Sequence, residues 1–84
     1  MPLTNIPDVT HPHTNFTLAE AIRIAVDHAT TFDRKVPESL EEVRRYIQEM
    51  ARHTGHHWIT GYAALDVLDA AIDGKDLSAH SRLI

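Results

Sequence analysis

Three histidines stand close together near the middle of the chain, and imidazole is a common ligand for zinc and related metals. His53 and His57 are four residues apart, a spacing that places two side chains on one face of a helix. The stretch His11-Pro12-His13 could add further ligands. Gly55 lies between His53 and His57, no acidic residue stands in this predicted loop, and no zinc signature is matched. We therefore expect surface histidines at a helix end, with His53 and His57 as metal ligands in the alternative.

Three aspartates follow one face of a predicted helix: Asp66, Asp69 and Asp73. Their spacing makes like charges neighbours, and Asp73 would lie near a helix C-terminus, where the dipole disfavours negative charge. Each effect costs a few tenths of a kcal/mol. Such an arrangement indicates a cationic partner. Arg44 or Arg45 could supply the charge within the chain; otherwise a basic surface of another protein would dock there.

Trp58 and Tyr62 are four residues apart at the start of the same predicted helix. Aromatic side chains with a polar group are enriched in contact hot spots, although core packing is the alternative and the favoured one for Trp58. The predicted partner-binding set is therefore Trp58, Tyr62, Asp66, Asp69 and Asp73.

Catalytic patterns are weak in this sequence. There is no cysteine, no glycine-rich phosphate loop and no Gly-x-Ser-x-Gly elbow. His28 with Asp27 or Asp33 resembles a base with its orienting carboxylate, but any helical surface offers such pairs. We expect a protein that is not an enzyme and that uses no cofactor.

Helices must position these residues. Thr17-Leu18-Ala19-Glu20 has the capping-box pattern, so the first helix is predicted to begin there. The apolar residues that follow recur at intervals of three and four: Leu18, Ala21, Ile22, Ala25, Ala29 and Phe32. The helix ends within residues 33–37, because the residue before Pro37 is biased away from the α region.

The second helix is predicted to begin after Ser39, with Val36 as the alternative cap. Its apolar seam consists of Leu40, Val43, Ile47 and Met50. Gly55 suits the position after a helix end, and the third helix is predicted over residues 58–72, stopped by Gly74. One continuous helix through Gly55 is the alternative, but the apolar pattern changes face there, which favours a turn.

The two ends of the chain are predicted to be arms. Residues 1–15 hold three prolines, and their apolar side chains are three apart: Leu3, Ile6 and Val9. This pattern favours an extended arm that lies across its own bundle or across a second copy. Residues 75–84 form a second arm. The predicted fold is all-α, a single domain over 1–84 in which a three-helix core over 16–74 lies between extended N-terminal and C-terminal arms.

Composition limits the classes of function. The chain has 84 residues, a net charge of −4 and no cysteine. A chain this short buries about 63% of its unfolded surface, which leaves no room for a deep pocket. No stretch approaches the roughly 18 apolar residues of a membrane span, and the N-terminus lacks a secretory pattern. We therefore expect a cytoplasmic protein without membrane contact, and its small core favours a homo-oligomer.

The predicted second and third helices have the outline of a helix-turn-helix. Residues 58–72 carry no lysine or arginine and two aspartates, so electrostatics opposes docking on nucleic acid. The sequence favours a non-catalytic protein–protein interaction module, a small regulatory, adaptor or inhibitor protein that acts through apolar arms, the aromatic pair and the acidic helix face. Histidine-dependent binding of a metal or small ligand is the alternative, and nucleic-acid binding ranks below it.

Overall fold

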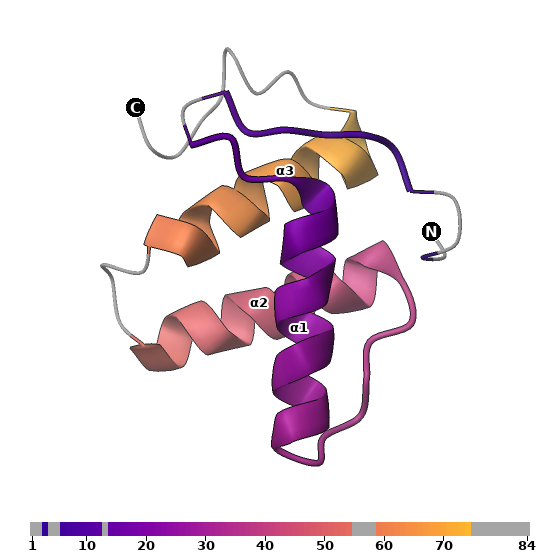
Figure 1. The fold of residues 1–84 in the computed structure, drawn as a ribbon, viewed down its shortest axis with the longest axis vertical. Helices are drawn as coiled ribbons and strands as arrows, with labels where there is room; N and C mark the ends of the chain where they lie inside the picture. The colour runs from indigo at the N-terminus through magenta and orange to yellow at the C-terminus, as the bar shows by residue number, and fades with distance from the viewer. Residues whose placement is uncertain (1–2, 4–5, 13, 55–58, 75–84) are drawn as a thin grey trace.

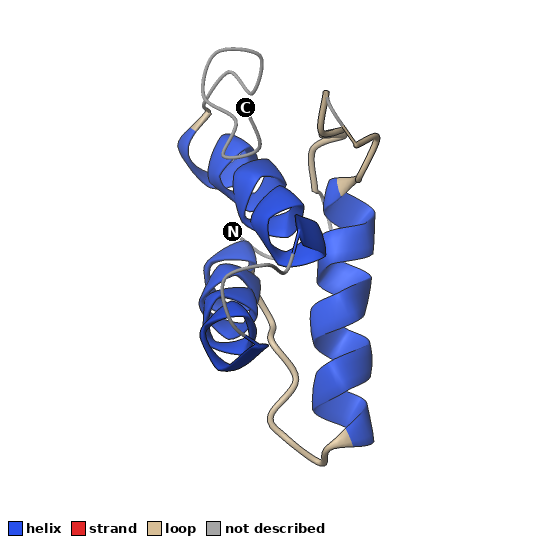
Figure 2. Ribbon diagram, turned by 90° about the vertical axis from the view of Figure 1, so that its left-hand side faces the viewer, coloured by secondary structure: helices blue, strands red, loops and turns tan. Residues whose placement is uncertain are grey.

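The computed structural model describes residues 3, 6–12, 14–54 and 59–74. Within them the chain forms three helices, α1 (Leu18–Thr31), α2 (Leu40–Thr54) and α3 (Ile59–Asp73). Helices α2 and α3 lie side by side, and α1 crosses both (Figures 1 and 2). The predicted all-α three-helix bundle is confirmed.

Helix α1 begins where the capping box predicted. Thr17 is the N-cap, and its Oγ1 accepts a hydrogen bond from the Glu20 backbone N–H at 3.2 Å. The Glu20 carboxylate in turn accepts from the Thr17 hydroxyl at 3.3 Å, in place of the backbone N–H that completes a full capping box. This cap fixes the entry into α1, whose buried face includes Leu18, Ala21 and Ala25.

The C-terminus of α1 is a Schellman motif. The Arg34 N–H donates to the Ala29 carbonyl at 2.8 Å, and the Asp33 N–H donates to the Thr30 carbonyl at 3.4 Å. Asp33 has φ +53°, so an aspartate occupies the left-handed position that glycine usually takes. The motif turns the chain sharply and places Arg34 beside the last turns of α1.

Helix α2 is capped by Ser39 and not by Val36. The Glu42 backbone N–H donates to Ser39 Oγ at 3.2 Å. The seam residues Leu40, Val43 and Ile47 are buried, while the opposite face carries charged and amide side chains. This division is the amphipathic pattern of a helix that covers one side of a core.

Helix α3 is the central element of the core. Most of its side chains from Gly61 to Asp69 are buried, and Tyr62 is half-buried. A helix that is apolar nearly all round is stable only when neighbours cover it on several sides. Here α1, α2 and the N-terminal arm provide the cover (Figure 1).

The break between the second and third predicted helices is confirmed, because α2 ends at Thr54, α3 begins at Ile59 and the two pack together. A continuous helix is therefore wrong. The Gly55 turn itself, His57, Trp58 and the predicted C-terminal arm (75–84) lie outside the described residues.

The N-terminal arm folds back along the start of α1. The Leu18 N–H donates to the Val9 carbonyl at 2.9 Å, and the His11 N–H donates to the Phe16 carbonyl at 2.7 Å. Asn15, at φ +59°, turns the chain between these two stretches. Three apolar side chains of the arm pack partly buried against the core: Leu3, Ile6 and Val9. Of the two predicted placements, the structure shows the arm on its own bundle, so these side chains are not an exposed apolar arm.

Candidate functional site

The predicted acidic face of α3 is largely buried within the chain. Asp66 Oδ2 accepts a hydrogen bond from His11 Nε2 at 3.0 Å, and both side chains are 0% exposed. Asp66 therefore faces the N-terminal arm and is not available on the surface. A buried carboxylate is tolerated only where it is hydrogen-bonded, and His11 provides that bond from 55 residues away.

Asp69 is also satisfied within the chain. Its Oδ1 accepts from Arg44 Nε at 2.5 Å, and the two side chains are 9% and 32% exposed. The prediction that a helix 2 arginine would face this aspartate is confirmed. Asp73 lies at the end of α3 and is exposed. The acidic docking face therefore does not exist as predicted: two of its three carboxylates stabilise the fold.

The remaining predicted site residues are only partly described. Tyr62 is half-buried on α3, while Trp58 and His57 lie outside the described residues, so the aromatic pair and the His53–His57 pair stay predictions. His53 is exposed near the end of α2. Among the described residues no group of three histidine, aspartate or glutamate side chains is placed to hold a metal ion.

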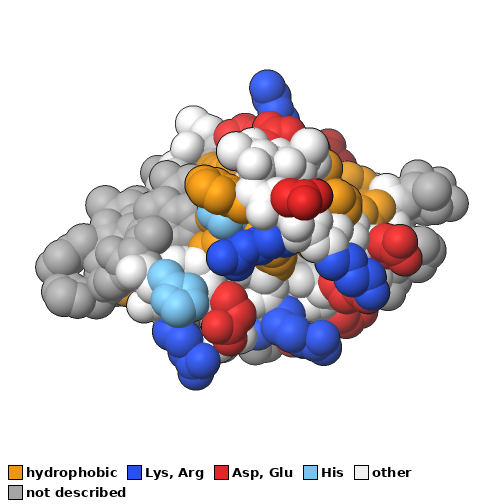
Figure 3. Space-filling model, turned by 90° about the horizontal axis from the view of Figure 1, so that it is seen from below, with side chains coloured by type: hydrophobic (Ala, Val, Ile, Leu, Met, Phe, Trp, Pro, Cys, Tyr) orange, Lys and Arg blue, Asp and Glu red, His pale blue; other side chains and the backbone are white. Residues whose placement is uncertain are grey.

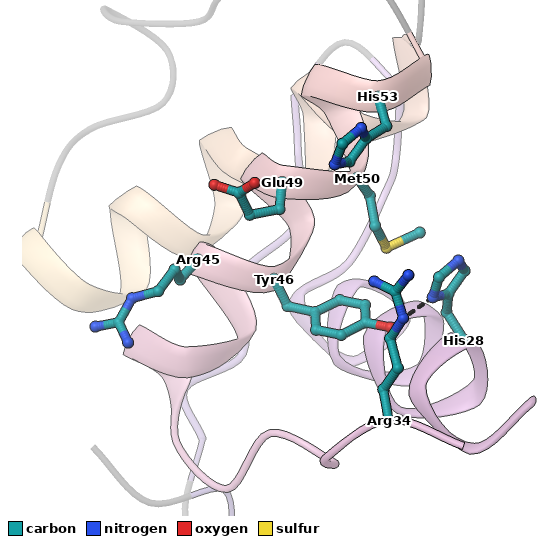
Figure 4. Close-up of a pocket in the computed structure, with 7 residues that line it drawn as sticks. All are labelled: His28, Arg34, Arg45, Tyr46, Glu49, Met50 and His53. Atoms are coloured by element: carbon teal, nitrogen blue, oxygen red, sulfur yellow. Dashed lines mark hydrogen bonds between the residues drawn. The ribbon is translucent and has the colours of Figure 1, made fainter. Parts of the chain in front are cut away.

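A different surface is hollowed between α1 and α2. A half-open cavity of about 460 Å³ lies there, and we call it the α1–α2 groove. Its lining side chains come from α1, the loop that follows it, and one face of α2: His28, Arg34, Arg45, Tyr46, Glu49, Met50 and His53 (Figure 4). Although so short a chain was expected to leave no room for a deep pocket, two crossing helices leave an open groove.

A row of three rings crosses from α1 to α2 at this groove, and two of them, His28 and Tyr46, line it. His28 Nδ1 lies 2.5 Å from the Tyr46 hydroxyl, a hydrogen bond that joins α1 to α2 (Figure 4). The two rings meet edge to face with centroids 5.5 Å apart, and the Phe32 ring lies 4.5 Å from His28 on the other side. Such ring pairs add about 0.5–1.5 kcal/mol each beyond area burial. These contacts hold the row Phe32–His28–Tyr46 together, with Phe32 exposed and the other two rings half-buried.

Figure 4 shows how the groove side chains are directed. Arg34, Tyr46, Met50 and His28 point toward one another, whereas Arg45 extends away along the rim. The Schellman motif explains the position of Arg34, because its backbone is bonded back to α1. On the face at this end of the molecule, arginine and lysine side chains alternate with acidic ones around apolar and histidine surface (Figure 3).

The α1–α2 groove could not be predicted from the sequence. The sequence pattern suggests Asp27 or Asp33 as the partner of His28, but in the structure His28 bonds to Tyr46. Asp27 Oδ2 instead lies 3.7 Å from Arg23 Nε. A signal was present in the spacing, because the groove residues of α2 lie four and three apart on one face beside the apolar seam: Tyr46, Met50 and His53. What the spacing could not show is which face of α1 lies opposite.

No helix in the described part of the chain is both long enough and apolar enough to cross a bilayer. Comparison of the chain with protein-family models, with curated proteins and with solved structures found no match.

Proposed function

We propose that this chain is a non-catalytic protein–protein interaction module and that its partner binds at the α1–α2 groove. The observation that carries the proposal is the row Phe32–His28–Tyr46 beside a cavity, in which Phe32 is exposed and the other two rings are half-buried. Phe32 is 60% exposed and its ring lies tilted against His28, which lines the groove. An exposed aromatic side chain next to a cavity suits a contact surface, because binding hot spots cluster where aromatic side chains meet a pocket.

The composition of the groove supports the proposal. Tyrosine, methionine and arginine are enriched at protein interfaces, and hot spots cluster where aromatic side chains meet a pocket. Met50 adds an adaptable apolar surface between Tyr46 and His53. Val36, the other large apolar side chain exposed among the described residues, lies on the same loop as Arg34.

The partner surface predicted from the sequence is less accessible than the groove, which supports the groove as the proposed surface. Asp66 and Asp69 are engaged inside the chain, and Leu3, Ile6 and Val9 cover the core. The burial of α3 argues against docking of this helix in a nucleic-acid groove, because a recognition helix must present one open face. Self-association and a cytoplasmic location stay predictions, and light scattering measures the first.

Site-specific photocrosslinking tests the proposal. Phe32 is replaced by p-benzoylphenylalanine, which keeps an aromatic ring at the rim, and the chain is irradiated in cells of its source organism. We expect a crosslinked protein that is absent when the same probe replaces Arg23, an exposed residue of α1 whose ion pair with Asp27 is separate from the groove.

The variant Tyr46→Ala provides the second control, since it removes a ring that lines the groove but keeps the probe at position 32. The crosslink at position 32 should weaken at least fivefold while circular dichroism still shows a folded helical chain. If no crosslink is specific to position 32, or if Tyr46→Ala leaves it unchanged, the groove is not the partner site.

A further inference from the structure

We infer that the partner segment bound at the α1–α2 groove is an acidic peptide stretch with one apolar anchor side chain. The inference rests on the proposed function and specifies the chemistry of the partner. Its starting point is the charge of the groove, because the whole chain carries a net charge of −4. The groove reverses that sign locally: its fixed charges are Arg34 and Arg45 against Glu49.

Ion pairing divides the described arginines into two groups. Three have an acidic partner at 4 Å or less: Arg23 with Asp27, Arg44 with Asp69, and Arg52 with Glu49. Arg34 and Arg45 have none among the described residues, and both line the groove. The single acidic side chain of the groove is engaged by Arg52 at 3.4 Å. Two guanidinium groups without an acidic partner among the described residues therefore lie at the groove, Arg34 within it and Arg45 along its rim.

The surface between these charges is apolar and aromatic. The Arg34 side chain points into the same space as Tyr46 and Met50 (Figure 4). A carboxylate that pairs with Arg34 would thus place the neighbouring side chain of its own peptide over the Tyr46 ring and Met50. Guanidinium binds carboxylates through two parallel hydrogen bonds, which fixes the direction of the peptide as well as its charge.

The size of the groove agrees with a peptide segment. A volume of about 460 Å³ lies in the range of sites that hold one or two large side chains or a small ligand. The imidazoles of His28 and His53 lie at the lining and offer further polar contacts for a backbone or carboxylate. The groove therefore fits an anchor residue flanked by aspartate or glutamate, such as a short acidic and hydrophobic motif.

Selection from a displayed library of random dodecapeptides tests the inference. The library is selected on the full 84-residue chain after depletion on the Tyr46→Ala variant, so that the remaining peptides depend on the groove. We expect aspartate and glutamate to be enriched over the unselected library, next to leucine, phenylalanine or tryptophan. Enrichment of neutral or basic peptides overturns the inference.

The most enriched peptide is then synthesised and its affinity is measured by fluorescence anisotropy. Arg34→Ala and Arg45→Ala should each weaken binding by about five- to twentyfold, because each removes a charge-assisted contact. Arg34→Lys should fall between Arg34→Ala and the unchanged chain, since lysine keeps the charge but not the planar fork. Arg23→Ala is the matched control and should leave the affinity unchanged.

Two further measurements decide the nature of the contact. Raising the salt concentration from 50 to 500 mM should weaken peptide binding severalfold, because exposed ion pairs are screened. A twelve-nucleotide single-stranded DNA serves as a competing anion, and tighter binding of this DNA than of the peptide overturns the inference. So does equal affinity of the peptide for Arg34→Ala, Arg45→Ala and the unchanged chain.

These outcomes separate the inference from the proposed function. If the selected peptides are not acidic but the crosslink at Phe32 depends on Tyr46, the groove is a protein-binding site and only the charge of the partner is wrong. If no selected peptide distinguishes the chain from Tyr46→Ala and no specific crosslink forms, both proposals fall.

Discussion

Two histidines of this protein make the same kind of bond in opposite surroundings. His11 joins the N-terminal arm to Asp66 of α3, and both side chains are completely buried. His28 joins α1 to Tyr46 of α2 at the wall of an open cavity. The first pair closes the fold, because its loss would leave a charged group in the core. The second pair is within reach of water, so it can be exchanged for contacts with a partner.

A short chain divides its polar groups between the core and the surface, and the energetic consequences differ. A hydrogen bond to a buried charged group is costly to remove, since the partner left behind stays desolvated. A hydrogen bond at a groove is inexpensive to remove, because water replaces the missing group. The histidines of one sequence can therefore differ in role: His11 is structural, His28 has a binding role only under the proposed function, and burial distinguishes the two.

The largest expected loss of stability follows from removing the Asp66 carboxylate. Asp66→Ala leaves His11 buried without its carboxylate, and we expect the free energy of unfolding to fall by about 3 kcal/mol. Urea denaturation followed by circular dichroism measures the change. His11→Ala should cost a similar amount, and the double variant less than the sum of the two. Additive losses would show that the two side chains are not coupled.

Arg44→Ala tests an ion pair whose burial lies between that of the His11–Asp66 pair and that of the groove. The Asp69 carboxylate is only 9% exposed, so removal of the guanidinium leaves a nearly buried charge with less compensation. We expect a loss of about 1–2 kcal/mol in the same urea experiment, between the effects at the buried pair and at the groove. Arg52→Ala is the matched control, because its pair with Glu49 is exposed and should contribute close to nothing. Equal losses for the two arginines would contradict the role given to burial.

Tyr46→Phe tests whether the His28–Tyr46 hydrogen bond contributes less to stability than the buried His11–Asp66 pair. It removes the hydroxyl that contacts His28 but keeps the ring, so the free energy of unfolding should fall by only about 0.5–1 kcal/mol. In the crosslinking experiment the signal at Phe32 should persist, because the ring surface remains. A loss of stability as large as that of Asp66→Ala would place this pair with the structural ones.

The smallest expected effect is at the end of α1. Asp33 occupies a left-handed backbone conformation at φ +53° in the Schellman motif. Asp33→Gly removes the strain of a side chain at this position, and we expect the unfolding free energy to rise by a few tenths to about 1 kcal/mol. Binding at the groove should stay unchanged, because the backbone that positions Arg34 is preserved. A fall in stability would mean that the Asp33 side chain makes a contribution of its own.

Much of the helical framework could be predicted from local sequence. Thr17 and Ser39 each accept a hydrogen bond from a backbone N–H three residues later. Each capping signal is therefore contained in four consecutive residues. The seam of α2 follows from regular spacing, and the break after Thr54 follows from its change of face. These features depend on neighbours along the chain, which the sequence displays directly.

The candidate site depends on residues that are distant along the chain. His11 reaches Asp66 only because the arm turns at Asn15 and lies along α3, and His28 meets Tyr46 only because α1 crosses α2 at that level. Like charges at helical spacing suggested a surface stripe. The sequence indicated Arg44 or Arg45 as a partner for this face, and the structure shows Arg44 at Asp69. It did not indicate His11 at Asp66 or the burial of both carboxylates, since burial is decided by crossing geometry.

The position of His11 also affects where a shorter fragment of this protein could begin. A fragment cut at the start of α1 would contain all three described helices and yet lack the His11 side chain that is bonded to Asp66. One side of α3 would then be exposed to water, and the Asp66 carboxylate would lie among apolar side chains without its bond to His11. The smallest piece able to fold by itself thus starts upstream of the first helix, and secondary-structure boundaries are a poor guide to trimming it.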